Sequence, residues 1–347
     1  MKQPRKKANR FGNKINIEIE LYFLRTMVFA DRFPVRALSC NYRPTFETMN
    51  LITPHMVERL QVQSRSPFEI HQILTRLEKT PETLVESELY LPEGEGPFGC
   101  VIALHGSLGW ADHHQDHING WLDAGLAVCK VNSFISRSID NTVNDQLTVT
   151  HAMMLVDAFR TRAVLEQNPK IGKIGISGWS LGGTVALYSS WSPLVEILGT
   201  PFDAHLSFYP AAHLRPDVQE WTESPKLILH GEADDWTPVH FVESLMPQLP
   251  NATLKVYPNA HHSFDCEHDY TYLPKAVHLK KRTIRIDKNG YMSGKLFLGL
   301  RLPTNKRWQR RWIIRLLQNR GATVEGNPEA RADVLVRSRE FFVEHLS

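Results

Sequence analysis

Short, continuous apolar segments recur along this chain from about residue 100 and alternate with segments of helical spacing. Segments without a polar face are typical of β-strands that are buried on both sides. Such strands separated by helices predict an α/β fold, with a mostly parallel sheet and helices on both faces. The predicted strands lie at residues 100–106, 126–134, 173–178, 204–210, 226–231 and 253–258, and a further strand at 85–96 ends in a Pro/Gly turn.

The length and composition of the chain set its domain organisation. With 347 residues, 42% of them hydrophobic and 22% charged, the chain can bury a large core. We expect residues 1–55, which show no sustained periodicity, to be a poorly ordered leader, and residues 56–347 to form one domain. The last helix of that domain should begin after Asn327, a suitable N-cap that is followed by Pro328.

Charge, hydropathy and cysteine content narrow the class of protein. The net charge of +3 is too small to indicate nucleic-acid binding, and no apolar segment approaches the ~20 residues that span a bilayer. The N-terminus resembles a signal peptide only loosely, because Arg25 interrupts its apolar core. We interpret it as a leader or as an over-extended start before Met27 or Met49. The widely spaced cysteines favour a reducing compartment and predict a cytoplasmic location.

A strongly basic segment interrupts the pattern between the last predicted strand and the last helix. Residues 280–320 hold thirteen Lys and Arg residues against one acid, Asp287, so this segment carries +12 and the rest of the chain −9. We therefore predict a basic insertion at about residues 275–322. Residues 305–317 mix arginine with tryptophan and aliphatic side chains, which suits a membrane-surface helix or a contact for an acidic partner. The near balance of charge favours a third interpretation, a cationic cover on an acidic domain, which could act as a lid.

One serine lies between glycines at the end of a predicted strand, in the sequence GISGWSLGG. G-x-S-x-G in this position is the pattern of a nucleophile elbow, a turn so tight that a Cβ at Gly178 or Gly182 would clash. The turn would project the hydroxyl of Ser180 above the sheet. It would also place the amide of Leu181 at a helix N-terminus, where it can donate to an oxyanion.

A serine nucleophile needs a base and a carboxylate that orients the base, in the chain order Ser, Asp or Glu, His. Asp234 follows the predicted strand 226–231, and His262 follows the strand 253–258. Because the carboxyl ends of parallel strands share one edge of a sheet, we expect these two side chains to meet Ser180. Asp235 and His261 are adjacent alternatives, and the spacing after the strands favours Asp234 and His262. The second oxyanion donor is predicted at the amide of Ser107, in the loop after the first buried strand.

The chain from about residue 58 to residue 346 resembles the dienelactone hydrolase family of α/β-hydrolases. The stretches that carry the resemblance are LYLPEG, VIALHGSLGW, GISGWSLGG, FYPAAHL, LILHGEADDWTP, VYPNAHHSFD and the last helix. The resemblance implies an α/β-hydrolase fold and hydrolysis of a small ester or lactone without a metal or organic cofactor. It assigns the nucleophile to Ser180, the acid to Asp234 and the base to His262.

The sequence departs from the family at the nucleophile itself. The best-known dienelactone hydrolases carry cysteine at the elbow, where this chain carries serine. A cysteine can be held as a thiolate, whereas a serine needs its base during the attack. The departure favours a serine esterase of wider or different substrate scope. A peptidase or amidase acting on short acyl peptides, and a non-catalytic binding protein on a hydrolase scaffold, are the alternatives.

Several side chains near the predicted strand ends are candidates for substrate binding. Arg137 could hold a substrate carboxylate, although a structural ion pair is the simpler role. His113 and His117 have the i, i+4 spacing of zinc ligands, but no third ligand is evident and we predict no metal. The aromatic candidates for an acyl pocket are Trp110, Phe134, Trp179, Tyr209 and Trp236.

Overall fold

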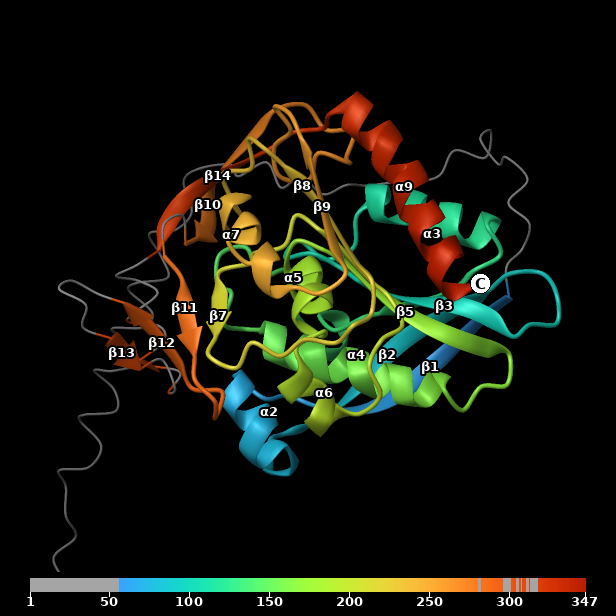
Figure 1. Ribbon diagram of the computed structural model, residues 1–347, viewed down its shortest axis with the longest axis horizontal. Helices are drawn as coiled ribbons and strands as arrows, with labels where there is room; N and C mark the ends of the chain where they lie inside the picture. The colour runs from blue at the N-terminus through green and yellow to red at the C-terminus, as the bar shows by residue number, and fades with distance from the viewer. Residues whose placement is uncertain are drawn as a thin grey trace, which may run out of the picture. The chain divides into compact units, whose positions relative to one another are not determined.

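An eight-stranded sheet forms the centre of the computed structural model, and its strand order is β1-β2-β4-β3-β5-β6-β8-β9 (Figure 1). The first two strands pair antiparallel, and β4, β3, β5, β6, β8 and β9 run parallel to one another. The predicted mostly parallel sheet is therefore confirmed. The bounds are β1 (Met56–Arg65), β2 (Glu82–Leu91), β3 (Phe98–Leu104), β4 (Ala127–Val131), β5 (Ile171–Trp179), β6 (His205–Phe208), β8 (Lys226–Gly231) and β9 (Ala252–Tyr257).

The structure describes residues 56–347 apart from 280–281, 296–300, 304–305, 307, 310–311 and 313–317. The predicted leader lies outside the described residues, as does most of the predicted surface helix at 305–317. Within the described part of the chain, no helix is both long enough and apolar enough to cross a membrane.

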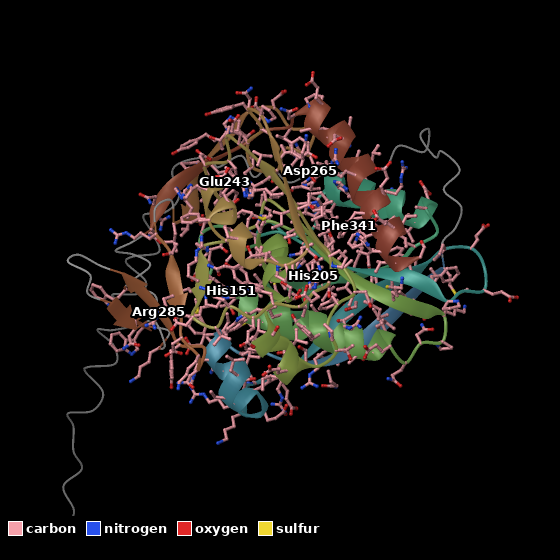
Figure 2. All side chains as sticks on the ribbon, viewed as in Figure 1. His151, His205, Glu243, Asp265, Arg285 and Phe341 are labelled. Atoms are coloured by element: carbon pink, nitrogen blue, oxygen red, sulfur yellow. The ribbon has the colours of Figure 1, made fainter. Side chains whose placement is uncertain are left out.

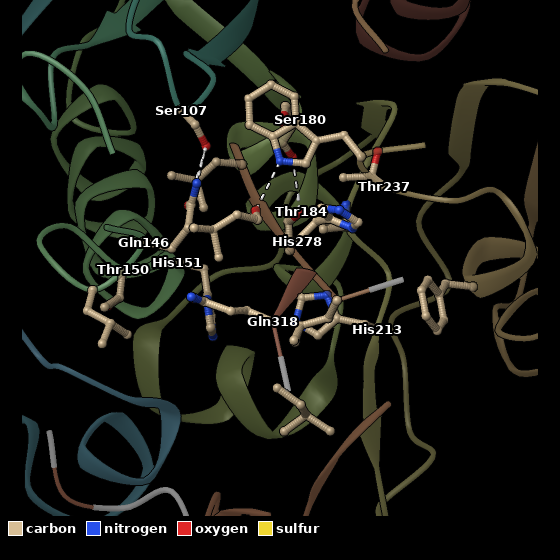
Figure 3. Close-up of a pocket in the computed structure, with 18 of the residues that line it drawn as sticks. Ser107, Gln146, Thr150, His151, Ser180, Thr184, His213, Thr237, His278 and Gln318 are labelled. Atoms are coloured by element: carbon tan, nitrogen blue, oxygen red, sulfur yellow. Dashed lines mark hydrogen bonds between the residues drawn. The ribbon is translucent and has the colours of Figure 1, made fainter. Parts of the chain in front are cut away.

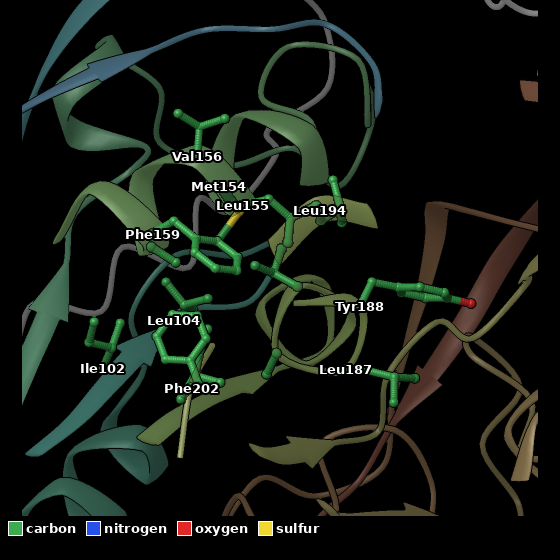
Figure 4. Packing of buried hydrophobic residues seen from close by; sticks show 14 of the residues in the cluster. Ile102, Leu104, Met154, Leu155, Val156, Phe159, Leu187, Tyr188, Leu194 and Phe202 are labelled. Carbon is green, nitrogen blue, oxygen red and sulfur yellow. The ribbon is translucent and has the colours of Figure 1, made fainter. Parts of the chain in front are cut away.

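Helices cover both faces of the sheet, as predicted (Figure 1). On one face, Met154, Leu155 and Phe159 of α4 belong to the same buried cluster as Ile102 and Leu104 of β3 (Figure 4). The other face carries α3 and the C-terminal helix α9. The helices are α2 (Ile70–Arg76), α3 (Asp112–Asp123), α4 (His151–Leu165), α5 (Leu181–Tyr188), α6 (Ser192–Leu198), α7 (His240–Glu243) and α9 (Pro328–Leu346), with short 3-10 turns at Leu77–Lys79, Ile135–Arg137 and Met246–Gln248.

The start of α9 follows the sequence prediction. The Asn327 side chain accepts a hydrogen bond from the amide of Ala330 at 3.0 Å, and Pro328 opens the helix. An N-cap of this kind satisfies a backbone donor that the first turn leaves without a partner. The cap therefore fixes where α9 begins after the basic segment.

The basic segment contributes strands rather than further α/β units. The strand β10 (Thr271–His278) pairs antiparallel with β14 (Asn319–Val324). Between them, β11 (Ile284–Ile286), β12 (Met292–Lys295) and β13 (Arg301–Pro303) form a second small sheet with β7 (Leu214–Pro216). Because β7 lies in the main part of the chain, this pairing attaches the segment to the edge of the fold (Figure 1).

Buried histidines should make the stability of the fold depend on pH. Burial lowers the pKa of His105 and His213 to about 4 and that of His205 to about 3, whereas imidazole in the unfolded chain titrates near 6.5. Between these values the unfolded chain binds more protons, so the free energy of unfolding falls as the pH falls. We expect each such histidine to contribute up to about 1.4 kcal/mol per pH unit below pH 6.5.

Urea unfolding at pH 7.5, 6.5 and 5.5 measures this effect. His205→Gln serves as the matched variant, because it removes one of the titrating imidazoles and should reduce the slope. A free energy of unfolding that stays constant from pH 7.5 to 5.5 would contradict the prediction.

Candidate active site

Ser180 occupies a sharp turn between β5 and α5, with φ 53° and ψ −106°. This conformation is costly for a residue with a side chain, and such strain is found where a site holds one group in a fixed place. The glycines around it leave no space for a side chain. A Cβ at Gly178 would lie 2.4 Å from the carbonyl carbon of Gly182, and a Cβ at Gly182 would lie 2.3 Å from the carbonyl oxygen of Leu104. The predicted elbow geometry is present.

His262 and Asp234 lie beside Ser180, although they come from different loops. The Nε2 atom of His262 is 2.9 Å from the Oγ atom of Ser180. Its Nδ1 atom is 2.7 Å from Oδ2 of Asp234. All three side chains are largely buried, and Ser180 is the most accessible of them at 9% exposure. The structure thus brings together the three residues that the sequence selected.

The surroundings of Asp234 fix the orientation of its carboxylate. Its Oδ1 atom accepts hydrogen bonds from the amides of Trp236 and Thr237, and its Oδ2 atom accepts one from the Thr237 hydroxyl. Burial alone would raise the pKa of Asp234, but the facing His262 and these hydrogen bonds hold it well below its usual value. The ionised carboxylate accepts the Nδ1 proton of His262, which leaves Nε2 free to accept the proton of Ser180.

The adjacent alternatives point elsewhere. Asp235 accepts a hydrogen bond from the amide of Thr323 on β14 at 2.8 Å. The Nε2 atom of His261 lies 3.6 Å from a carboxylate oxygen of Glu325. These two side chains attach the loops to the end of the basic segment, so they are separate from the Ser180 constellation.

Leu181 and Ser107, the residues predicted to supply the oxyanion donors, line the same cavity as Ser180. Leu181 is the first residue of α5, and first-turn amides have no carbonyl partner within their helix. The Gly106–Ser107 loop lies against the elbow, since a Cβ at Gly106 would be 3.6 Å from the Cβ of Ser180. Ser107 is held there by the amide of Thr142, which donates to its carbonyl at 2.8 Å. Its hydroxyl contacts the side chain of Gln146.

A cavity of about 380 Å³ opens at Ser180 (Figure 3). Its near end holds Ser107, Leu181 and Trp236, and its walls combine apolar side chains with histidines. The basic segment supplies one wall, through Val277, His278, Leu279, Ile284, Met292, Gln318 and Arg320. Sequence reasoning missed His151, His213 and His278, because they reach the cavity from α4, from the loop before β7 and from β10. No spacing along the chain connects them.

The other aromatic candidates and Arg137 lie outside this cavity. Arg137 forms a two-pronged ion pair with the buried Asp157, at 2.7 and 3.0 Å, and so has the structural role. The indole of Trp110 donates to Asn132 at 2.8 Å, and Phe134 packs against His105. Trp179 and Tyr209 are buried on the α3 and α9 side of the sheet. Of the aromatic residues predicted for the pocket, the cavity contains Trp236 alone.

The histidines with zinc-like spacing belong to a buried polar cluster. His117 Nε2 lies 3.2 Å from Oδ2 of Asp265, and His113 Nε2 lies 3.8 Å from Oδ1. Among the described residues no group of His, Cys, Asp and Glu side chains has an arrangement that could hold a metal ion. We therefore interpret the cluster through its hydrogen bonds and packing, and not as a metal site.

The chain matches the sequence model of a known family and is similar to solved structures. A sequence model of the dienelactone hydrolase family matches residues 88–284, which is more than half of the chain. The crystal structure of P91, a dienelactone hydrolase-like promiscuous phosphotriesterase from metagenomic libraries, is similar at 16% identity and a TM-score of 0.50, with 84% of this chain and 99% of that chain covered. No curated protein sequence matches significantly.

Two esterases of known structure are also similar, at lower TM-scores. Est1E from Butyrivibrio proteoclasticus has 16% identity and a TM-score of 0.42, over 53% of this chain and 88% of its own. The esterase Pf2001 of Pyrococcus furiosus has 16% identity and a TM-score of 0.43, over 60% of this chain and 85% of its own. At sequence identities this low, similarity to a solved structure is evidence for a shared fold only.

Proposed function

The chain belongs to the dienelactone hydrolase family and is a hydrolase acting on ester bonds, and from this premise we propose that it cleaves carboxylic esters or lactones through an acyl-enzyme formed on Ser180. The observation that carries the proposal is the unbroken chain of contacts from Ser180 Oγ through His262 to Asp234, at 2.9 and 2.7 Å. A serine hydroxyl is a weak nucleophile unless a base removes its proton during the attack, and this chain of contacts supplies that base.

In the acylation step, His262 takes the proton of Ser180 as the serine oxygen attacks the ester carbonyl. The carbonyl oxygen becomes an oxyanion, to which the amides of Leu181 and Ser107 donate hydrogen bonds. The ionised Asp234 stabilises the imidazolium that forms. The imidazolium then gives its proton to the leaving alkoxide, the carbon–oxygen bond breaks, and the acyl group stays on Ser180.

In the deacylation step, water replaces the alcohol. His262 takes a proton from the water as its oxygen attacks the acyl carbonyl, and the same two amides receive the second oxyanion. The bond to Ser180 Oγ breaks, the proton returns to that oxygen, and the carboxylic acid leaves. For a lactone, the alcohol and the acid are parts of one molecule, so the product is a hydroxy acid.

The cavity beside Ser180 limits the size of the substrate. A volume of about 380 Å³ is at the low end of the range for small-molecule sites, so we expect a small ester or lactone. The apolar side chains of the walls lower the polarity around the reacting carbonyl, which strengthens the hydrogen bonds to the oxyanion.

Trapping of the acyl-enzyme tests the proposal. We expect a burst of p-nitrophenol on mixing with p-nitrophenyl esters, followed by slower steady turnover, and a mass increase equal to one acyl group. A fluorophosphonate should add to the peptide that contains Ser180 in folded protein and not in denatured protein. The ester series should have acyl chains of graded length, with an aminoacyl p-nitroanilide as the amide arm.

The outcomes separate the proposal from its alternatives. Ester turnover with labelling at Ser180 supports it. Faster cleavage of the amide than of every ester would indicate a peptidase. No turnover and no labelling of folded protein would indicate a binding protein on a hydrolase scaffold.

A further inference from the structure

Asp265 carries another buried carboxylate, which contacts the residue before the nucleophile. Asp265 is fully buried, next to α3 and α9 (Figure 2). It accepts a hydrogen bond from the hydroxyl of Tyr209 at 2.8 Å and from the indole nitrogen of Trp179 at 3.1 Å. The imidazole of His117 lies 3.2 Å away. These groups come from four separate segments of the chain.

The protonation states in this cluster follow from burial and from the groups that face each side chain. Burial raises the pKa of Tyr209 well above its usual value, so the phenol keeps its proton and donates it to Asp265. Burial alone would also raise the pKa of Asp265, but the nearby imidazoles hold that pKa well below its usual value. Asp265 is therefore an anion, and a buried anion keeps its donors in place because losing one leaves charge without a hydrogen bond.

Asp265 and its two donors, Trp179 and Tyr209, are each connected to Ser180 or His262. Trp179 directly precedes Ser180 at the end of β5. Asp265 itself follows His262 by three residues, on the same loop. Tyr209 packs its ring against the ring of His262, with 4.7 Å between their centroids.

Tyr209 also reaches the acid. Its carbonyl oxygen lies 3.1 Å from the hydroxyl oxygen of Thr237, and the amide of Thr237 donates to Asp234 at 2.8 Å. The backbone of Tyr209 has φ 38°, a conformation that is unfavourable for a residue with a side chain and must be held by its surroundings. The hydrogen bond to Asp265 is part of what holds it.

We propose that Asp265 is a positioning residue for catalysis, because its one carboxylate joins the nucleophile strand, the base loop and the Tyr209 turn that supports the acid. The inference rests on the proposed function. It assigns to the HSFD sequence two roles, with the histidine as the base and the aspartate as the anchor that fixes where the base stands. Asp265 does not line the cavity and acts through the residues that it positions.

A purely structural role is the alternative, and the chain offers a matched control for it. Ser338 of α9 is also fully buried, and its hydroxyl contacts His117 Nδ1 at 3.1 Å and Trp121 Nε1 at 3.4 Å. It therefore belongs to the same polar region but does not touch Trp179, Tyr209 or the base loop. Ser338→Ala should lower the unfolding temperature and leave kcat unchanged.

The experiment compares Asp265→Asn, Tyr209→Phe, their double variant and Ser338→Ala in the full chain. Asp265→Asn and Tyr209→Phe should lower kcat for a p-nitrophenyl ester by about 10- to 100-fold with KM nearly unchanged, because a small displacement of reacting groups costs this much. The labelling rate of Ser180 by a fluorophosphonate should fall in parallel. The double variant should be at most about threefold slower than Asp265→Asn alone, since the Tyr209 hydroxyl acts through that carboxylate.

Conservative variants separate positioning from folding. Asparagine keeps one acceptor oxygen, and the indole of Trp179 can only donate, so Asp265→Asn should retain more activity than Asp265→Ala. If the Asp265 variants fail to fold, Tyr209→Phe and Trp179→Phe carry the test. Each of these two removes one donor and leaves the carboxylate in place.

The inference is overturned if Asp265→Asn and Tyr209→Phe lose stability but keep kcat within about twofold of the unchanged protein, as Ser338→Ala should. Additive losses in the double variant would also overturn it, because they would mean that the two residues act separately. Failure of the proposed function looks different, since Ser180 would then remain unlabelled in the unchanged protein.

Discussion

Ser180→Ala is expected to lower kcat for a p-nitrophenyl ester by about 10⁴- to 10⁶-fold, with KM changing little. The variant removes the only atom that forms the acyl bond, so neither His262 nor the oxyanion donors can act through an acyl-enzyme. Any remaining turnover is attack by water, assisted by the oxyanion site. Alanine meets the same backbone demand at φ 53° as serine, so the unfolding temperature should change little. Steady-state kinetics with thermal unfolding of the same samples measure both effects.

Ser177→Ala is the matched control for this variant. Ser177 lies on β5, three residues before Ser180, and its fully buried hydroxyl has no hydrogen-bond partner among the described residues. The chemical change is the same, but the hydroxyl is not near His262, so kcat should be unaltered. If Ser180→Ala retained more than about 1% of the original kcat, the acyl-enzyme would be excluded as the main route.

The parts of the fold and site that the sequence predicted are those governed by local chemistry. Strands β3, β5 and β8 are buried on both faces, so their apolar residues are consecutive and easy to identify. The elbow is equally local, because only glycine fits where Gly178 and Gly182 meet backbone atoms. Asp234 and His262 were found because parallel strands end at one edge of the sheet, so that residues distant in sequence meet there.

The local sequence pattern did not show in which direction each side chain points. Trp179 is the last residue of β5, and Ser180 lies in the turn that follows it. The side chain of Trp179 packs on the α3 and α9 side of the sheet and contacts Asp265, whereas Ser180 lines the cavity. Arg137 likewise follows a buried strand, but it pairs with Asp157 of α4, a contact that no spacing along the chain encodes.

The wall of the cavity was unpredictable for a related reason. The strands β10 and β14 are separated by forty residues and carry charged or polar side chains among their apolar ones, so neither resembles a buried strand in sequence. Their pairing places Val277 and Arg320 at the cavity. Strands of this kind are fixed by cross-strand partners that must first be brought together, and not by an apolar pattern of their own.

Asp234→Asn should lower kcat by about 10⁴-fold while the fold stays intact, and the reason is a change in the proton position on His262. The amides of Trp236 and Thr237 both donate to Oδ1, so the single oxygen of asparagine must remain there. The NH₂ group of asparagine then occupies the place of Oδ2, 2.7 Å from Nδ1 of His262. Because that group can only donate, Nδ1 must accept, and the ring proton moves to Nε2. The Nε2 atom then donates to Ser180 instead of removing its proton.

Asp235→Asn makes the same chemical change one residue away and is the control. Its side chain accepts from the amide of Thr323, and the oxygen of asparagine can do the same, so kcat should stay within about threefold of the original. Both variants lose one negative charge from the same loop, so a difference between them cannot come from net charge. If Asp235→Asn proved the more damaging of the two, the carboxylate that orients His262 would have been wrongly assigned. Loss of activity in Asp234→Asn with an unchanged labelling rate of Ser180 would contradict the tautomer argument, because the labelling also requires Nε2 to accept the serine proton.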